Sequence, residues 1–235
     1  MSPPPRVEPE ALPLFKGLDA SVRAMLLRHA MVQTVAPNTV LFEQGLTPTF
    51  QPVVLEGSVH LFGRASRGGE VLVDIVEPPE LVVPAAVMTA APYLVEARTQ
   101  APSRLLLLQA QAFREAVEQH PALGQAVIRS LSGQFRRMVR QVKNLKLRPA
   151  NQRVGCYVLA LARRQGAEVV TLPYEKTLIA SELGMTRESF SRALSLLQKH
   201  GVAMRGDTLR IVDRPRLEAF AEPDPLIDPD ETGLE

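Results

Sequence analysis

The sequence predicts an α+β fold in which a β-rich N-terminal region, one long helix and a compact helical C-terminal region follow one another. Three observations predict this order. Residues 35–109 consist of short apolar runs separated by glycine and proline. Residues 121–148 contain no acidic residue and repeat apolar positions at spacings of three and four. Residues 172–212 carry two short helical patterns followed by a hairpin signal.

The N-terminal region has the pattern of a β sandwich or jelly roll. Turn residues interrupt the apolar runs at short intervals, among them Gly45, Gly57, Gly63 and the pair Pro78-Pro79. Short strands with turn signals at such spacing are typical of closed all-β architectures. A chain of 235 residues has room for about two domains, and 46% hydrophobic residues can form packed cores. We therefore expect a β domain in residues 1–120.

The region 121–148 is predicted to be one continuous helix with an apolar stripe. Six residues recur at spacings of 3, 4, 3, 4 and 3, namely Ile128, Leu131, Phe135, Met138, Val142 and Leu145. This is a heptad pattern, and a helix of this length needs a partner. Packing against its own domain is one interpretation. The basic flanks favour the other, a dimerisation seam with a second copy of the chain.

The C-terminal region, predicted as residues 149–220, begins its core with two short helices joined tightly. Gly184 is typical of the end of the first helix, and Thr186 can cap the second. Four apolar residues of the second helix share one face and should pack inward: Phe190, Ala193, Leu194 and Leu197. A hairpin signal follows at Arg205-Gly206-Asp207. A helix-turn-helix followed by a hairpin is a winged helix.

Polar side chains gather at the exposed N-terminal end of the second helix, where a recognition helix meets base edges in the major groove. Arginine binds guanine bidentately, glutamate accepts from cytosine, and serine serves several bases. An ordinary charged surface helix is the alternative, but the surrounding pattern favours double-stranded DNA. The candidate DNA-binding residues are Thr186, Arg187, Glu188, Ser189, Ser191 and Arg192, with Lys176 and Arg205 as phosphate contacts.

The final residues, 221–235, are rich in acid, and this composition predicts a solvated, disordered tail. The longest uncharged stretch, residues 81–95, contains two prolines and is too short to span a bilayer. Residues 1–9 are proline-rich and lack the apolar core of a signal peptide. We therefore expect no membrane partner and a cytoplasmic location.

These motifs resemble a known family. The run Glu188-Ser189-Phe190-Ser191-Arg192 matches the E-x-x-S-R recognition motif of the Crp/Fnr transcription regulators, Fnr branch. FEQG at 42–45 and VLEGSVHLF at 54–62 resemble their cyclic-nucleotide-binding fold. Residues 172–194 most resemble the Dnr, NnrR and FixK regulators. The resemblance implies a jelly-roll sensor domain, a dimerisation helix and a winged helix-turn-helix.

The resemblance also implies a mode of action. Such a protein is a homodimer on a pseudo-palindromic site of the form TTGAT-N4-ATCAA, and it recruits RNA polymerase as an activator. Repression at some sites is equally compatible with these residues. Arg187 stands where the Crp branch, which reads TGTGA, has arginine, so the half-site stays open at one or two positions.

The nucleotide-binding residues of the family have no match here. Cyclic-nucleotide binders carry a G-D-x-F-G-E segment and a later R-S-A segment that hold ribose and phosphate. The corresponding stretches in this chain are residues 79–84, PELVVP, and Val95-Glu96-Ala97. Glu96 would repel a phosphate, and Arg98 should face away from Ala97 on an alternating strand. We predict no response to cyclic AMP.

Other cofactors are constrained by cysteine and histidine. An iron-sulfur cluster needs about four cysteine ligands, and this chain has only Cys156, so we expect no cluster. Cys156 lies in an apolar helical segment and is expected to be a buried thiol, with a redox switch as the alternative. Haem stays open, and the candidate axial ligands are His29, His60, His120 and His200, each with a surface or capping role as the alternative.

Two other classes of function are alternatives to a DNA-binding regulator. A small-molecule-binding or haem-binding module with a secondary or lost DNA function is the first alternative. An enzyme is not expected, because no nucleophile, base and acid cluster in the sequence, and neither a P-loop nor a metal-ligand spacing is present.

Overall fold

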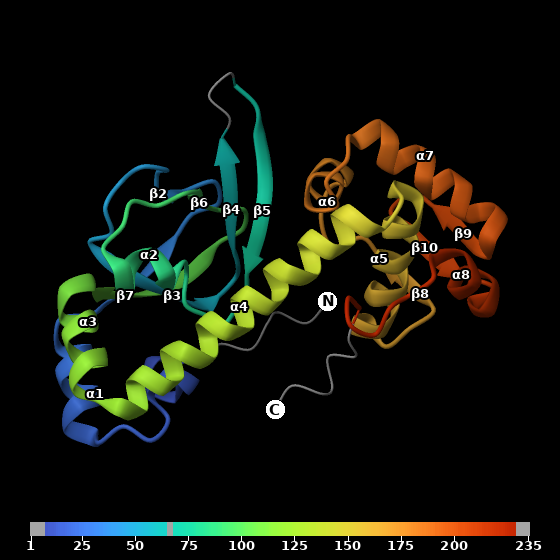
Figure 1. Ribbon diagram of the computed structural model, residues 1–235. Coiled ribbons are helices and arrows are strands. Elements are labelled where there is room, and N and C mark those ends of the chain that lie inside the picture. The colour runs from blue at the N-terminus through green and yellow to red at the C-terminus, as the bar shows by residue number, and fades with distance from the viewer. Residues whose placement is uncertain (1–7, 65–67, 229–235) are drawn as a thin grey trace. The chain divides into compact units, whose positions relative to one another are not determined.

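The computed structural model describes residues 8–64 and 68–228 (Figure 1). The chain divides into two compact units, Met1–Gln134 and Phe135–Glu235. We call them the roll unit and the winged unit. The predicted α+β class is confirmed, with a β-rich first unit, a long helix and a helical second unit.

The roll unit contains two antiparallel sheets. The first has the order β1-β7-β3, formed by Met31–Val35, Ser103–Gln109 and Phe50–Glu56. The second has the order β2-β6-β4-β5, formed by Val40–Phe42, Glu96–Thr99, Val59–Arg64 and Glu70–Val76. Strands β4 and β5 extend as a hairpin beyond the other strands (Figure 1). The predicted jelly-roll type of β domain is therefore present.

Alternation along the strands builds two cores in the roll unit. Val54 and Leu105 belong to the core between the sheets, whereas Val53 and Leu106 belong to a core that includes the helices. Successive side chains of a strand point to opposite faces, so one sheet serves both cores. The elements around these sheets are η1 (Pro9–Ala11), η2 (Pro13–Phe15), α1 (Ala20–Arg28), α2 (Pro84–Thr89) and α3 (Ala110–Gln119).

Helix α4, Pro121–Leu147, begins in the roll unit and ends in the winged unit. Its first turns bury Leu123 and Val127 in the helical core of the roll unit. Leu131 packs partly against that core, while the other five residues of the predicted stripe are between 44% and 66% exposed: Ile128, Phe135, Met138, Val142 and Leu145. None of the helices in residues 8–64 and 68–228 combines the length and hydropathy that a bilayer crossing requires.

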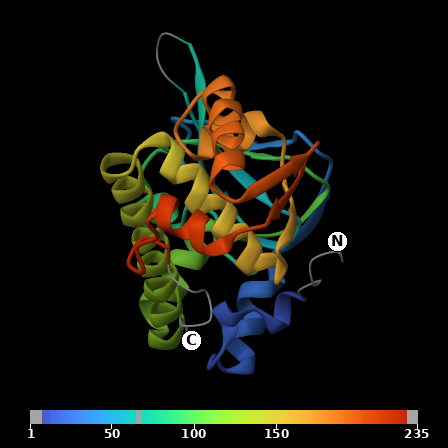
Figure 2. The same ribbon diagram turned by 90° about the vertical axis from the view of Figure 1, so that its right-hand side faces the viewer.

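The winged unit packs helices α5, α6, α7 and α8 with a small sheet (Figure 2). Its sheet has the order β8-β10-β9, with all pairs antiparallel. Helix α5 packs against both α7 and α8. The elements are α5 (Ala150–Gln165), β8 (Val169–Thr171), α6 (Lys176–Glu182), α7 (Arg187–Leu197), η3 (Gln198–His200), β9 (Val202–Arg205), β10 (Thr208–Ile211) and α8 (Arg214–Ala221). The predicted winged helix-turn-helix is confirmed.

The predicted disordered tail differs from the structure. Residues 229–235 lie outside the described residues, but residues 221–228 pack on the winged unit. Ala221 ends α8 and is fully buried, and Ile227 is 8% exposed. Asp228 forms an ion pair with Arg148, and Asp224 lies 3.8 Å from the Nζ atom of Lys143. Within residues 221–228, Asp224 and Asp228 are therefore paired with basic side chains of the same unit, whereas Glu222 is exposed to solvent as the acidic composition predicted.

Candidate nucleic-acid interface

The turn between α6 and α7 has the geometry of a helix-turn-helix. Gly184 has a φ of +63°, a left-handed conformation that favours glycine. A side chain at this position would also collide with the Leu145 side chain. After the turn, the Thr186 hydroxyl accepts a hydrogen bond from the backbone N–H of Ser189 at 3.2 Å. Thr186 is therefore the N-cap of α7, as its position in the sequence predicted.

The inner face of α7 is held by the core of the winged unit. Phe190, Ala193 and Leu197 have no exposed area, and Leu194 is 2% exposed. They pack in one cluster with residues of α5, α6 and the sheet. The rotation of α7 about its own axis is therefore fixed, and this decides which side chains face outward.

The outer face of α7 presents the predicted base-reading residues. Arg187, Glu188, Ser191 and Arg192 are all exposed at its N-terminal end. The Nη2 atom of Arg192 donates to the Ser189 hydroxyl at 2.9 Å, which restrains the guanidinium. Hydrogen bonds from the Glu188 backbone and the Thr186 hydroxyl lower the pKa of the Glu188 carboxyl, so this side chain is an ionised acceptor near neutral pH.

The two predicted phosphate contacts lie at different sites. Arg205 is exposed at the end of β9. Lys176 begins α6, and its Nζ atom lies 3.5 Å from the Oδ1 atom of Asp207. Asp207 belongs to the turn between β9 and β10, residues 206–207, which we call the wing turn. The wing turn is also tied to the preceding loop, because its Asp207 carbonyl accepts from Leu172 N–H at 3.0 Å. Lys176 thus has a carboxylate partner, whereas Arg205 extends toward solvent.

Arg153 is a residue of this region that the sequence analysis did not identify. Its guanidinium is largely buried and donates to the carbonyls of Leu183 at 3.0 Å and Gly184 at 3.4 Å, within the helix-turn-helix. A third bond, 2.9 Å long, reaches the carbonyl of Arg148. The only signal in the sequence was a single arginine before an apolar helical run.

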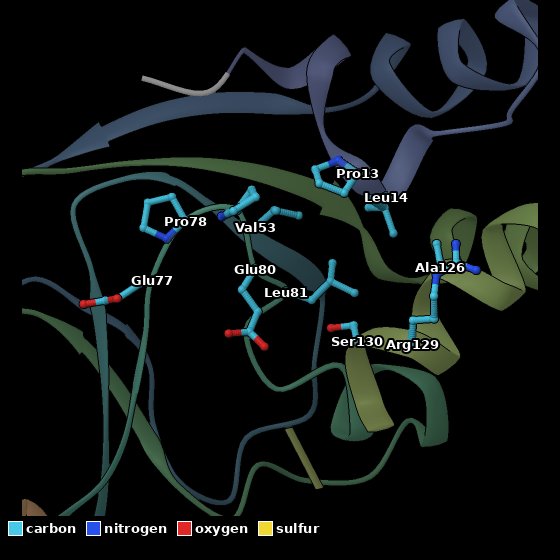
Figure 3. Close-up of a pocket in the computed structure, with 11 residues that line it drawn as sticks. Pro13, Leu14, Val53, Glu77, Pro78, Glu80, Leu81, Ala126, Arg129 and Ser130 are labelled. Carbon is cyan, nitrogen blue, oxygen red and sulfur yellow. The ribbon is translucent and has the colours of Figure 1, made fainter. Parts of the chain in front are cut away.

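Residues 79–84, which we call the cassette segment because the family resemblance sets them against G-D-x-F-G-E, border a pocket of about 460 Å³ in the roll unit (Figure 3). The pocket is lined by the carboxylates of Glu77 and Glu80 and by the guanidinium of Arg129 from α4. The Glu80 carboxylate accepts from Gln134 Nε2 at 3.2 Å. The remaining walls are mainly proline and apolar, from Pro13, Leu14, Val53, Pro78, Pro79, Leu81, Ala126 and the hydroxyl residue Ser130.

Strand β6 places its charged residues away from the space between the sheets. Ala97 belongs to the core between the sheets and is fully buried. Glu96 is 1% exposed and lies 2.6 Å from Arg64 Nη2, and Arg98 pairs with Glu70 at 2.6 Å. Arg98 therefore faces away from Ala97, as the strand alternation predicted.

The candidate haem ligands have ordinary surroundings. His60 is fully buried, with Nε2 at 3.1 Å from the Ser58 hydroxyl, and burial followed by the charge of Arg98 lowers its pKa to about 4. His200 stacks on Phe220 with ring centroids 4.0 Å apart. His29 and His120 are the C-cap residues of α1 and α3. Within the described residues, these histidines thus have a hydroxyl partner, a ring partner or a position at a helix end.

Cys156 is buried on α5. Its thiol is 3% exposed and lies 3.3 Å from the Ala221 carbonyl, to which it donates. Burial raises the pKa of the thiol to about 12. A thiol with so raised a pKa is a poor nucleophile, which favours the packing role over the redox alternative.

Comparison with known proteins identifies both units. The family model of the Crp-like helix-turn-helix domain matches residues 152–220. The family model of the cyclic nucleotide-binding domain matches residues 32–120. The first match contains α6, α7 and the wing, and the second contains the seven strands of the roll unit apart from the first residue of β1.

Similar proteins align along most of the chain. The chain is 24% identical over 210 residues to the CRP-like cAMP-activated global transcriptional regulator of Mycobacterium tuberculosis, covering 87% of this chain and 94% of that protein. It is 26% identical over 193 residues to the nitrogen fixation regulation protein FixK of Bradyrhizobium diazoefficiens, covering 78% of each. The structure of FixK2 from Bradyrhizobium japonicum shares the fold, with a TM-score of 0.67, 20% identity and coverage of 81% and 96%. Both domain matches, in this order along one chain, show that this protein belongs to the Crp/Fnr family of transcription regulators.

Proposed function

We propose that the protein acts in the cytoplasm as a homodimeric, sequence-specific regulator that binds a pseudo-palindromic site of the TTGAT-N4-ATCAA kind. One observation carries this proposal. Helix α7 is fixed in rotation by its buried face, and its capped N-terminal end presents Glu188, Ser191 and Arg192 to solvent. This is the end of a recognition helix that contacts base edges.

The side chains on α7 match the hydrogen-bonding groups of such a half-site. Arg192 supplies the fork of donors that guanine O6 and N7 accept, and the ionised Glu188 accepts from the amino group of cytosine. Ser191 can donate or accept. Arg187 adds a second guanidinium at the same end. Because the Crp branch, which reads TGTGA, has arginine at this place, Arg187 leaves the half-site open at one or two positions.

A gel-shift titration tests this proposal. Three duplexes are compared, one with TTGAT half-sites, one with TGTGA half-sites and one with scrambled half-sites of the same composition. We expect the first to bind at least about 1000-fold more tightly than the scrambled duplex, which is the low end for specific recognition. Equal affinity for all three would refute sequence-specific recognition, and preference for TGTGA would refute the half-site assignment.

The homodimer is supported by the stripe on α4. Phe135 and Met138 are 66% and 57% exposed, and apolar area of this kind is stabilised when a second helix covers it. A dimer would present two α7 helices to half-sites one helical turn apart. Sedimentation analysis of the full chain should give a dimer, and Met138→Glu should shift it to a monomer. A monomer of the unaltered chain in the presence of its operator would contradict the proposal.

We propose further that cyclic AMP does not control the protein. The mycobacterial relative is named as cAMP-activated. The pocket beside the cassette segment of this chain carries two carboxylates, Glu77 and Glu80, against the one guanidinium of Arg129, so the net charge of its lining repels a phosphate. The segment also lacks glycines that would let backbone amides approach the phosphate. Calorimetric titration with cyclic AMP should give no saturable heat, and the DNA affinity should not change. Saturable binding coupled to tighter DNA binding would overturn this point.

The remaining parts of the proposal concern cofactors and the effect on transcription. A single buried cysteine and four histidines in ordinary surroundings support a protein without an iron-sulfur cluster or haem. The purified protein mixed with haem should show no shift of the Soret band.

At a promoter, we propose that the protein recruits RNA polymerase. Transcription in vitro from a promoter carrying the site should rise on addition of the protein, and a decrease would assign repression instead.

A further inference from the structure

We propose that residues 222–228 form a strap that locks the junction between α4 and α5 onto the helix-turn-helix, and so fixes the position of α7 relative to the end of α4. This inference rests on the proposed function, because it concerns how a dimer places its recognition helices. The strap follows α8 and returns alongside α5 within the winged unit (Figure 1).

The strap holds the junction through one buried ion pair. Arg148 lies between α4, which ends at Leu147, and α5, which begins at Ala150. Both terminal nitrogens of Arg148 donate to the carboxylate of Asp228, the Nη1 bond to Oδ1 being 2.9 Å long. The two side chains are only 6% and 11% exposed. Burial opposes the charge of Arg148, but the bonds to Asp228 outweigh it and raise its pKa.

The junction is tied in turn to the helix-turn-helix. Arg153 donates to the carbonyl of Arg148 and also to the carbonyls of Leu183 and Gly184, so one guanidinium joins the junction to the turn before α7. Leu145, in the last turns of α4, packs against Gly184. A displacement of the junction would therefore break contacts with the turn that positions α7.

The strap itself is anchored at several points. Ile227 is buried, and the carboxylate of Asp228 accepts from the backbone N–H of Asp224 at 3.0 Å. The backbone carbonyl of Asp228 accepts from Arg163 Nη1 on α5 at 3.3 Å. Asp228 thus contacts its own segment, α5 and the junction. A charge-assisted pair that is mostly desolvated is costly to break on one side, because the remaining charge stays buried.

The spacing of the two half-sites distinguishes a strap from a contact that only adds stability. If the junction is rigid, a dimer should bind well at one half-site spacing and poorly at another. If the junction loosens, the penalty for a wrong spacing should fall. A contact that contributes stability alone would leave the ratio of the two affinities unchanged.

The experiment compares the full chain with Asp228→Asn and with a matched control, Glu222→Gln. Glu222 lies in the same segment, changes the net charge equally, and is exposed. Dissociation constants are measured on duplexes with N4 and N5 spacers. We expect the N5 to N4 ratio to fall by at least about threefold in Asp228→Asn and to stay unchanged in Glu222→Gln. An unchanged ratio in Asp228→Asn would overturn the strap.

Hydrogen exchange provides a readout that needs no DNA. The amides of Arg148, Arg153 and Gly184 are hydrogen-bonded within the junction and the turn. In Asp228→Asn the exchange of these amides should accelerate by about tenfold, because the loss of one charge-assisted hydrogen bond makes local opening of the junction about that much more frequent. In Glu222→Gln the exchange should not change. Unchanged exchange in Asp228→Asn would refute the strap. If the unaltered protein bound neither duplex, the proposed function would fail, while exchange would still decide the strap.

Discussion

The winged unit and the roll unit both match a domain model of the family, but they differ in the side chains that they present. In the winged unit, the packed face of α7 is accompanied by exposed Glu188, Ser191 and Arg192. In the roll unit, the packed sheets are accompanied by a pocket lined by prolines and by the carboxylates of Glu77 and Glu80. The difference teaches that apolar spacing maintains a fold, while a few surface side chains carry its ligand chemistry and can change independently.

The largest expected effect concerns packing in the winged unit. Phe190 is fully buried in the cluster that holds α7. Phe190→Ala should lower the free energy of unfolding of this unit by about 3–5 kcal/mol, because it removes buried area and leaves a cavity. Urea unfolding followed by far-UV circular dichroism measures it. A loss below about 1 kcal/mol would show that α7 is held by something other than this face.

The second effect concerns chemistry two residues further along the same helix. Arg192→Ala should leave the unfolding midpoint nearly unchanged, because Arg192 is exposed. It should weaken binding to the TTGAT duplex by about 1–3 kcal/mol, or roughly 5- to 150-fold. Binding to the scrambled duplex should fall much less. If both duplexes lost affinity equally, Arg192 would be a phosphate contact and not a base reader.

The third effect tests burial in the roll unit. The pKa of His60 is lowered to about 4 in the folded protein, first by burial and then by Arg98, against 6.5 when unfolded. Between these two pKa values the unfolded chain therefore binds more protons than the folded chain. The contribution of the neutral, buried His60 to the free energy of unfolding is complete above about pH 6.5 and is lost as the pH falls toward 4. Between about pH 7 and about pH 5 the free energy of unfolding should fall by about 2 kcal/mol.

Urea unfolding at the two pH values measures this change. His60→Gln should remove most of the dependence, whatever it does to stability at neutral pH. A variant that keeps the full pH dependence would show that other groups of the roll unit, and not His60, are responsible.

The smallest effect concerns the cap of α7. Thr186→Ala removes the hydroxyl that accepts from Ser189 N–H and should cost about 1 kcal/mol of stability. Thr186→Ser keeps the hydroxyl and serves as the control. Thermal unfolding measures both variants. Equal losses in the two would assign the effect to the methyl group and not to the cap.

Local sequence was sufficient where the determining interactions are close along the chain. The cap at Thr186, the left-handed turn at Gly184 and the inward face of α7 all depend on residues within a few positions of one another. Helix α4 and its exposed stripe follow from the same kind of periodicity. The periodicity of the apolar residues also predicted which residues of α7 are exposed, because the residues opposite a buried helix face must point toward solvent.

Tertiary structure decided the features that join distant residues. Composition assigned residues 221–235 to solvent, yet Asp228 pairs with Arg148, 80 positions earlier. Arg153 gave no local signal, because two of its three carbonyl partners, those in the helix-turn-helix, are 30 and 31 positions away. The sequence by itself determined the helices and strands and the buried faces of the helices. Only the tertiary structure decided which charged side chains form ion pairs. The strength of an ion pair depends on the distance between the two charges in space, and no periodic pattern in the sequence predicts that distance.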